Sequence, residues 1–175
     1  MRRFGEWYPF NNENIFALPP GSLSHNSLIK AGLIVDYTNV NSMTLVNLGL
    51  LIIRVVIGLT FVGHGSQKLF GWFGGYGPVG FGQWLESLGM GFHGKFWSIA
   101  AGLFEFVGGL LFAFGTLTGV GAGLIIIVML DAILIVHRTK GYWIDNGGWE
   151  YNFVLIAVVL GIALIGPGSY VLLKL

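Results

Sequence analysis

Long runs of apolar residues occupy most of the chain after residue 43. They cover residues 46–68, 96–115, 118–136 and 152–173. Each run is close to the roughly 20 residues that a helix needs to cross about 30 Å of hydrocarbon, and none alternates strictly as a barrel strand does. The pattern predicts an all-α polytopic membrane protein, built as a bundle of four transmembrane helices.

The connections between the runs differ in length. Residues 114–119 leave room only for a tight turn, so the second and third helices should be antiparallel neighbours. Residues 69–95 are rich in glycine and aromatic residues, and within them Phe81, Trp84, Leu85 and Leu88 would share one face of a short helix. We expect this helix to lie at the membrane interface, between the first two spans.

Residues 1–42 form a polar N-terminal arm without an apolar run of spanning length. The arm lacks the apolar segment of a signal peptide. Because Met43 directly precedes the first span, either translation starts there naturally or the arm is an accessory segment, and both interpretations stay open. Residues 43–175 form the membrane domain in either case.

Composition agrees with a membrane protein and excludes several kinds of chemistry. The mean hydropathy is +0.76, and only 10% of the residues are charged. Without cysteine, the chain has no disulfide, no cysteine-ligated iron-sulfur cluster, no thiol nucleophile and no covalent haem. No motif predicts b-type haem or a metal site, and a net charge of +1 without a basic stripe gives no indication of nucleic acid.

Three ionisable residues fall inside the apolar runs. A guanidinium in hydrocarbon costs at least about 2.5–3.5 kcal/mol, so Arg54 should face protein or trapped water and have an acidic partner. Glu105 belongs to a stripe of small residues that lets another helix approach closely. We therefore expect Arg54 to contact Glu105, with Asp131 as a second acidic partner. Such a network would either fix the helix register or serve a ligand or proton path.

Glycine spacing in the third run suggests close packing of helices. Gly119 and Gly123 have the GxxxG spacing that serves helix packing in apolar segments. We expect these two glycines to act in packing alone, and the glycine-rich helices also allow a homo-oligomer.

One end of the predicted bundle collects most of the polar chemistry. The ionisable and tryptophan residues at this end are His64, Lys68, Trp72, Trp84, His93, Lys95, Trp97, His137, Arg138, Trp143, Asp145, Trp149 and Glu150. A single aromatic residue at a membrane interface ordinarily anchors the protein there. Because the residues listed above gather at one end of the bundle, however, we expect a pocket or docking surface at this end. The basic residues at this end favour it as the cytoplasmic one, with both termini outside.

The motifs also appear in a characteristic order: RVVIGLTFVGHGSQKLFG, AAGLFEFVGGLLFAFG, IVMLDAILIVHR, WEYN and GPGSYVL. In this order the chain resembles the DoxX family from about Leu48 to Leu172. The resemblance implies a multi-pass four-helix protein of a bacterial or archaeal inner membrane, with relatives linked to thiosulfate:quinone oxidoreductase subunits and to oxidoreductases of quinone or catechol stress. The N-terminal arm and Asp131 depart from the family pattern.

The resulting hypothesis is a quinone-binding subunit that supports electron transfer from a partner protein carrying the redox centre. Quinone reduction takes two protons with two electrons, which suits imidazole and carboxylate groups at a membrane-edge pocket. Proton handling is assigned to His64, Glu105 and His137. The quinone pocket is assigned to Arg54, Lys68, Trp72 and Glu150, with Glu150 positioning His137.

Other functions remain open at this point. A noncatalytic scaffold subunit of a larger complex is the alternative from another class, and a small-solute or proton transporter is a third. Because no cofactor motif is present, whether the chain is itself an enzyme is left open.

Overall fold

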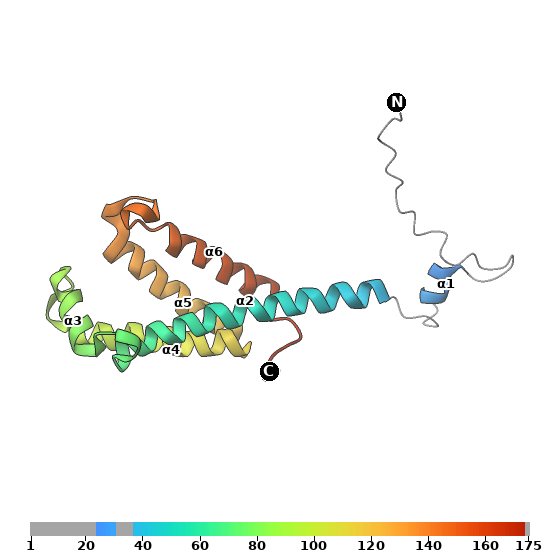
Figure 1. The fold of residues 1–175 in the computed structure, drawn as a ribbon, viewed down its shortest axis with the longest axis horizontal. Helices are drawn as coiled ribbons and strands as arrows, with labels where there is room; N and C mark the ends of the chain where they lie inside the picture. Colours follow the sequence, from blue (N-terminus) through green and yellow to red (C-terminus); the bar gives the residue numbers. More distant parts are fainter. Residues whose placement is uncertain (1–23, 31–36, 174–175) are drawn as a thin grey trace, which may run out of the picture. The chain divides into compact units, whose positions relative to one another are not determined.

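The computed structural model describes residues 24–30 and 37–173 (Figure 1). By its internal contacts the chain divides into residues 1–42 and residues 43–175. The described part of the first unit consists of α1 (His25–Lys30) and the beginning of α2. Most of the N-terminal arm lies outside the described residues, so its origin stays a prediction.

Every regular element in the described ranges is helical, which confirms the all-α prediction for this part of the chain. The longer helices are α2 (Tyr37–Leu69), α3 (Gly77–Ser87), α4 (Gly94–Phe114), α5 (Thr118–Ala132) and α6 (Glu150–Ile165). Short 3₁₀ helices lie at Trp72–Gly74, Gly91–His93, Arg138–Lys140 and Ile144–Asn146. A π-helical turn, Ile133–His137, continues α5 toward the polar end of the bundle.

Three helical segments are long and apolar enough to cross a membrane, namely Val40–Leu69, Gly91–Phe114 and Thr118–Lys140. They overlap the first three predicted spans and make the chain a multi-pass membrane protein. The fourth apolar helix, α6, has 16 residues and therefore extends about 24 Å, less than the thickness of the hydrocarbon core. The prediction of a helix through residue 173 is wrong, because α6 ends at Ile165. A fourth crossing of the membrane stays a prediction.

Close glycine contacts determine how α2 packs on α4. A Cβ atom on Gly58 would lie 2.5 Å from the carbonyl oxygen of Gly109, and one on Gly65 would lie 2.7 Å from that of Gly102. The later glycine of α2 thus meets the earlier glycine of α4. The two helices are therefore antiparallel, with their backbones in direct contact (Figure 1). This register decides which polar side chains can meet.

The turn between α4 and α5 is as tight as predicted. Gly115 and Leu117 both have positive φ, at 73° and 49°, and α5 packs against α4 and α6. The glycine that makes this packing close is Gly121, whose added Cβ would lie 2.9 Å from the carbonyl oxygen of Gly108. Gly119 and Gly123 meet no described atom within 4 Å, so within the chain the predicted packing role falls to the glycine between them.

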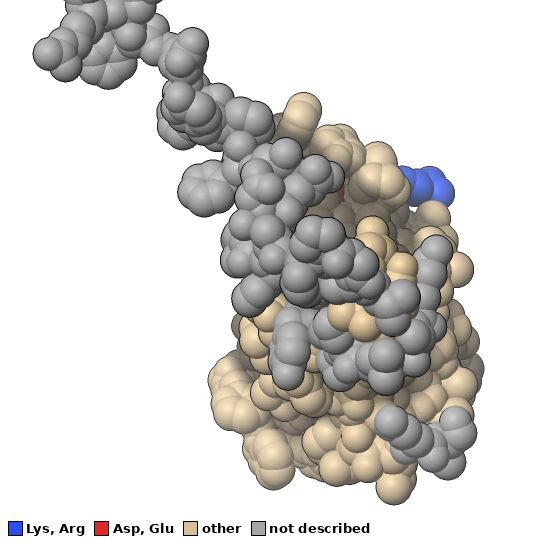
Figure 2. Space-filling view, turned by 90° about the vertical axis from the view of Figure 1, so that its right-hand side faces the viewer, with Lys and Arg blue, Asp and Glu red and all other residues tan. Residues whose placement is uncertain are grey.

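The apolar core lies between α2, α4, α5 and α6. Phe61, Phe112, Ile125 and Val159 are almost completely buried in it. Figure 2 views the bundle from the end where α4 finishes, and the described surface seen there carries almost no charged side chains.

Candidate functional site

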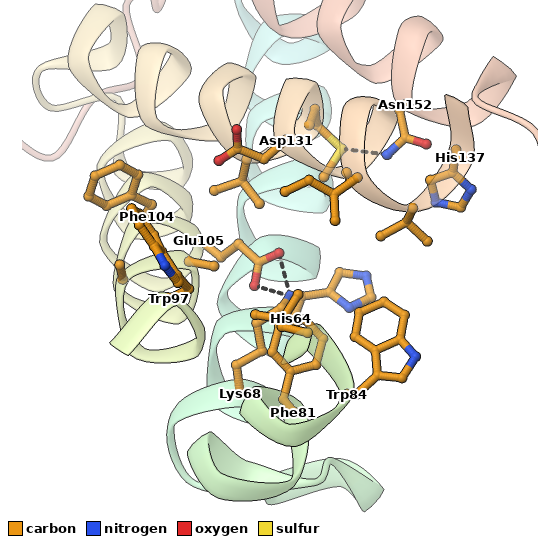
Figure 3. A pocket seen from close by; sticks show the side chains of 18 of the residues that line it. His64, Lys68, Phe81, Trp84, Trp97, Phe104, Glu105, Asp131, His137 and Asn152 are labelled. Carbon is orange, nitrogen blue, oxygen red and sulfur yellow. Dashed lines mark hydrogen bonds and ion pairs between the residues drawn. The ribbon is translucent and has the colours of Figure 1, made fainter. Parts of the chain in front are cut away.

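A cavity of about 400 Å³, which we name the inner cavity, lies at the end of the bundle where α2 ends and α4 begins (Figure 3). Residues from all five longer helices of the membrane unit line it, and most of them are apolar or aromatic. Five histidine, lysine and acidic residues also line it: His64, Lys68, Glu105, Asp131 and His137. The structure thus brings together groups that are far apart in the sequence.

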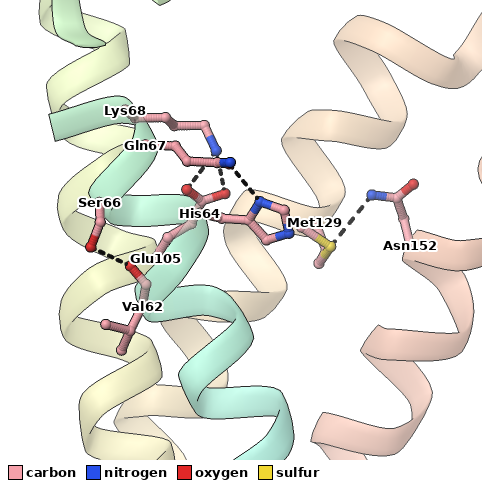
Figure 4. A network of polar contacts seen from close by, with 8 residues as sticks. All are labelled: Val62, His64, Ser66, Gln67, Lys68, Glu105, Met129 and Asn152. Carbon is pink, nitrogen blue, oxygen red and sulfur yellow. Dashed lines mark hydrogen bonds and ion pairs between the residues drawn. The ribbon is translucent and has the colours of Figure 1, made fainter. Parts of the chain in front are cut away.

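Lys68 and Glu105 form an ion pair in the wall of the inner cavity. Lys68 Nζ lies 2.6 Å and 2.5 Å from the two carboxylate oxygens, and the side chains are 16% and 3% exposed (Figure 4). Gly102, one turn before Glu105 on α4, gives Lys68 room to reach it, since an added Cβ would lie 3.1 Å from Lys68 Cβ. The charge-assisted contact neutralises both groups and joins α2 to α4.

The predicted contact between Arg54 and Glu105 is not formed. Arg54 precedes Lys68 by fourteen residues on α2, which corresponds to about 21 Å along the helix. The antiparallel register places it against Gly115, the residue that follows α4, where an added Cβ would collide with the guanidinium. Arg54 is completely buried there, and its Nη2 donates a hydrogen bond to the Tyr170 carbonyl.

Two further nitrogens of Arg54, Nε and Nη1, have no hydrogen-bond partner among the described residues. The carbonyl groups at the end of α4 carry partial negative charge, which favours a cation at this position. Asp131 is not a partner of Arg54 either, because it lines the inner cavity at the other end of the bundle. The predicted network of three charges is therefore replaced by one ion pair and two separate groups.

His64 and His137 line the inner cavity from α2 and from the π-helical turn after α5. His64 Nδ1 lies 3.2 Å from Gln67 Oε1, and His137 Nδ1 lies 2.6 Å from the carbonyl oxygen of Gly147. Both partners are acceptors, so in the neutral form of each ring Nδ1 carries the proton and Nε2 is an acceptor. Each imidazole can then receive a proton at a known atom.

Two other predicted site residues lie outside the inner cavity. Trp72 is 57% exposed and packs on Phe70, with ring centroids 4.9 Å apart. Glu150 accepts a hydrogen bond of 3.0 Å from the backbone N–H of Ile144. Glu150 therefore holds the Ile144–Asn146 turn that precedes α6, and the group that holds His137 is the Gly147 carbonyl.

The sequence matches a known family over the region that builds this site. The DoxX family model matches residues 49–138, which include the five histidine, lysine and acidic residues of the inner cavity. The chain belongs to the DoxX family. This DoxX protein is 28% identical over 115 residues to a Bacillus subtilis (strain 168) protein named "Putative oxidoreductase CatD". That alignment covers 66% of this chain and 78% of the relative, and no solved structure matches the chain.

Some residues that line the inner cavity of this DoxX protein were not predicted as site residues. Asn152 on α6 is 6% exposed and donates from Nδ2 to Met129 Sδ at 3.4 Å. Phe81 and Trp84 on α3, predicted as an interfacial face, line the inner cavity. A buried amide at the start of an apolar run is a signal that could have drawn attention to Asn152.

Proposed function

We propose that the inner cavity binds a quinone, and that the protein is a membrane subunit in which this quinone exchanges electrons with a partner oxidoreductase. The observation that carries the proposal is an apolar cavity with hydrogen-bonding groups on two opposite sides. In Figure 3, Asp131, His137 and Asn152 lie on one side, and Lys68, Phe81 and Trp84 lie on the other. The similarity to a protein named as an oxidoreductase supports a redox role.

The chemistry of the lining suits a quinone. A quinone has a flat apolar ring with a carbonyl oxygen at each side, so it needs aromatic or apolar contacts in the middle and donors at both ends. Trp97 and Phe104 offer the aromatic contacts. Lys68 offers a donor from α2, and Asn152 offers one from α6. A volume of about 400 Å³ is within the usual range for small-molecule sites.

The ionisable groups suit the proton transfers that quinone reduction requires. Reduction takes up two protons with two electrons, and imidazole is the side chain best suited to carry protons near neutral pH. His64 and His137 face the inner cavity from different helices, and Glu105 is held in place by Lys68. We assign the electrons to the redox centre of the partner protein.

We further propose that the protein lies in a bacterial or archaeal cytoplasmic membrane, with the cavity end toward the cytoplasm. The basic residues Lys68, Lys95, Arg138 and Lys140 support this orientation by the positive-inside rule. α3 would then lie at that interface, with Leu85 buried and Val79 exposed.

Quinone binding by the purified, detergent-solubilised protein tests the proposal. A menaquinone analogue is titrated while the tryptophan fluorescence of the protein is followed, because Trp84 and Trp97 lie in the cavity wall. We expect saturable binding that Glu105→Gln weakens about tenfold, or about 1.4 kcal/mol, because Lys68 loses its partner. Asp145→Asn, an exposed carboxylate outside the cavity, is the matched control and should bind as the wild type does. Folded wild-type protein without saturable binding would reject the proposal and favour the scaffold subunit.

A further inference from the structure

A second cavity, of about 560 Å³, adjoins the inner cavity, and we name it the outer cavity. Its lining residues are His64, Gln67, Lys68, Gly74, Gly75, Tyr76, Gly80, Phe81 and Trp84. His64, Lys68, Phe81 and Trp84 line both cavities, so their side chains form the partition between them. The outer cavity involves only the last turns of α2 and the segment through α3, whereas the inner cavity extends to Glu105 and Val128.

Most of the surface in both cavities is apolar, and the outer cavity has the somewhat larger polar share. Apart from Phe81 and Trp84 in the partition, the outer cavity is lined by polar side chains and glycines. Gly75 packs directly against α2, because an added Cβ would lie 2.5 Å from the carbonyl oxygen of Gln67. The side chains of His64, Gln67 and Tyr76 can hydrogen-bond to water in the outer cavity, whereas the larger apolar surface of the inner cavity suits an organic ring.

A residue of the outer cavity, Gln67, orients the imidazole ring of His64. Gln67 lines only the outer cavity, and its Nε2 donates to the Phe73 carbonyl at 3.3 Å. That contact turns Gln67 Oε1 toward His64 Nδ1, which leaves His64 Nε2 as the free acceptor. The charged groups beside His64 in the inner cavity are Lys68 on its own helix and Glu105 on α4, and these two neutralise each other.

We propose that the outer cavity is a water-filled vestibule through which protons reach the quinone, and that His64 carries them across the partition. This inference rests on the proposed quinone site. In quinone reduction, a hydrated proton from bulk solvent passes through the vestibule water to His64 Nε2, which then gives the proton to a quinone oxygen and returns to the neutral ring, while the partner oxidoreductase supplies the electrons. One of the two protons taken up per two electrons follows this route. Gln67 is a positioning residue, because it acts only through the His64 ring.

The absence of cysteine allows a direct test of water in the outer cavity, because each single-cysteine variant carries one thiol. Gln67→Cys places the thiol in the outer cavity, Val128→Cys places it in the inner cavity, and Leu59→Cys places it on an exposed part of α2 in the membrane. With a charged, membrane-impermeant methanethiosulfonate reagent, we expect Gln67→Cys to react at least tenfold faster than the other two. Equally slow labelling of all three would overturn the vestibule, whatever the outcome for quinone binding.

A second experiment tests the role of Gln67 and His64 in proton transfer. The bound menaquinone analogue is reduced at an electrode, so no partner protein is needed, and its affinity is measured separately. Gln67→Leu should slow proton-coupled reduction about tenfold and leave the Kd within twofold of the wild type, whereas Gln67→Glu, which keeps an acceptor for His64 but loses the donor to the Phe73 carbonyl, should have a rate between those of Gln67→Leu and the wild type. An unchanged rate in Gln67→Leu, or a loss of affinity equal to the loss of rate, would contradict the proton route.

Discussion

Lys68 and Glu105 form an ion pair in the wall of the inner cavity, with Nζ 2.6 Å and 2.5 Å from the two carboxylate oxygens. The pair joins the last turn of α2 to the middle of α4. It also belongs to the partition, because Lys68 lines both cavities. Lys68 Nζ lies 5.0 Å from the centre of the Phe81 ring, so α3 contributes to the same arrangement.

Removing one member of this pair should destabilise the protein more than removing both. Glu105→Gln or Lys68→Met leaves the opposite charge without its partner in an apolar wall, and breaking a buried pair costs about 3–5 kcal/mol. The double variant removes both charges and should therefore be more stable than either single variant. Thermal unfolding in detergent measures the effect in all four proteins. Losses that simply add in the double variant would show that the two groups are not coupled.

The glycines that bring α2 and α4 together should tolerate substitution very differently from their neighbours. A Cβ on Gly65 would lie 2.6 Å from the backbone nitrogen of Phe106, whereas one on Gly63 meets no described atom within 4 Å. Gly65→Ala should lower the free energy of unfolding by about 1–3 kcal/mol, as overpacking does. Gly63→Ala is the matched control and should be neutral or slightly stabilising, because alanine favours a helix over glycine. Equal unfolding temperatures for the two variants would contradict the close contact.

The helices and the polar end of the bundle could be predicted from the sequence, because length, hydropathy and turn residues are local properties. The partner of Glu105 could not, since it depends on the register between two helices. A usable signal was nevertheless present. Gly58 and Gly65 on α2 have the same spacing as Gly102 and Gly109 on α4, and antiparallel alignment of these pairs brings Glu105 close to the end of α2 rather than to its middle.

The prediction from the sequence also extended α6 too far, although the residues that end this helix follow it directly in the chain. Gly166 has a φ of 98°, which favours glycine, and Pro167 has no N–H to continue a helical ladder. Hydropathy alone extended the predicted helix across this break, because the residues after it are again apolar. The cavity lining could be predicted only in part, since it also depends on how α3 folds back toward α4.

His137 should contribute to quinone binding, and His93 should not. His137 lines the inner cavity and is held through Nδ1 by the Gly147 carbonyl, whereas His93 is an exposed residue outside it. Loss of one hydrogen bond to the ligand costs about 0.5–1.5 kcal/mol, so His137→Ala should weaken binding roughly two- to tenfold. His93→Ala is the matched control. Fluorescence titration with the menaquinone analogue would contradict this role if both variants bind equally well.

Arg54 should stabilise the C-terminal segment without affecting the inner cavity. Its Nη2 contacts the Tyr170 carbonyl, and in the same segment the Ser169 N–H donates to Asn47 Oδ1 at 2.8 Å and the Leu172 N–H to the Phe114 carbonyl at 2.9 Å. Arg54→Leu removes the first of these contacts, so the amides of Ser169 and Leu172 should exchange with solvent faster.

The matched control for this prediction is Arg138→Leu, a basic residue at the opposite end of the bundle. Hydrogen exchange followed by mass spectrometry compares the two variants with the wild type, and quinone titration shows whether the cavity is affected. Unchanged exchange in Arg54→Leu would mean that the arginine does not hold this segment. A large loss of quinone affinity would instead link Arg54 to the cavity, as the sequence first predicted.

Replacing Asp131 with asparagine, its uncharged equivalent, should make the protein more stable. It lines the inner cavity, and in the described part of the chain no side chain forms an ion pair or hydrogen bond with it. An unpaired carboxylate inside a membrane span is costly, because no nearby cation offsets its loss of hydration. Asp131→Asn keeps the shape and removes the charge, so the unfolding temperature should rise by about 2–4 °C per kcal/mol gained. The exposed Asp145→Asn is the matched control and should leave it unchanged. A lower unfolding temperature for Asp131→Asn would instead show that the carboxylate binds a cation or donor in the folded protein.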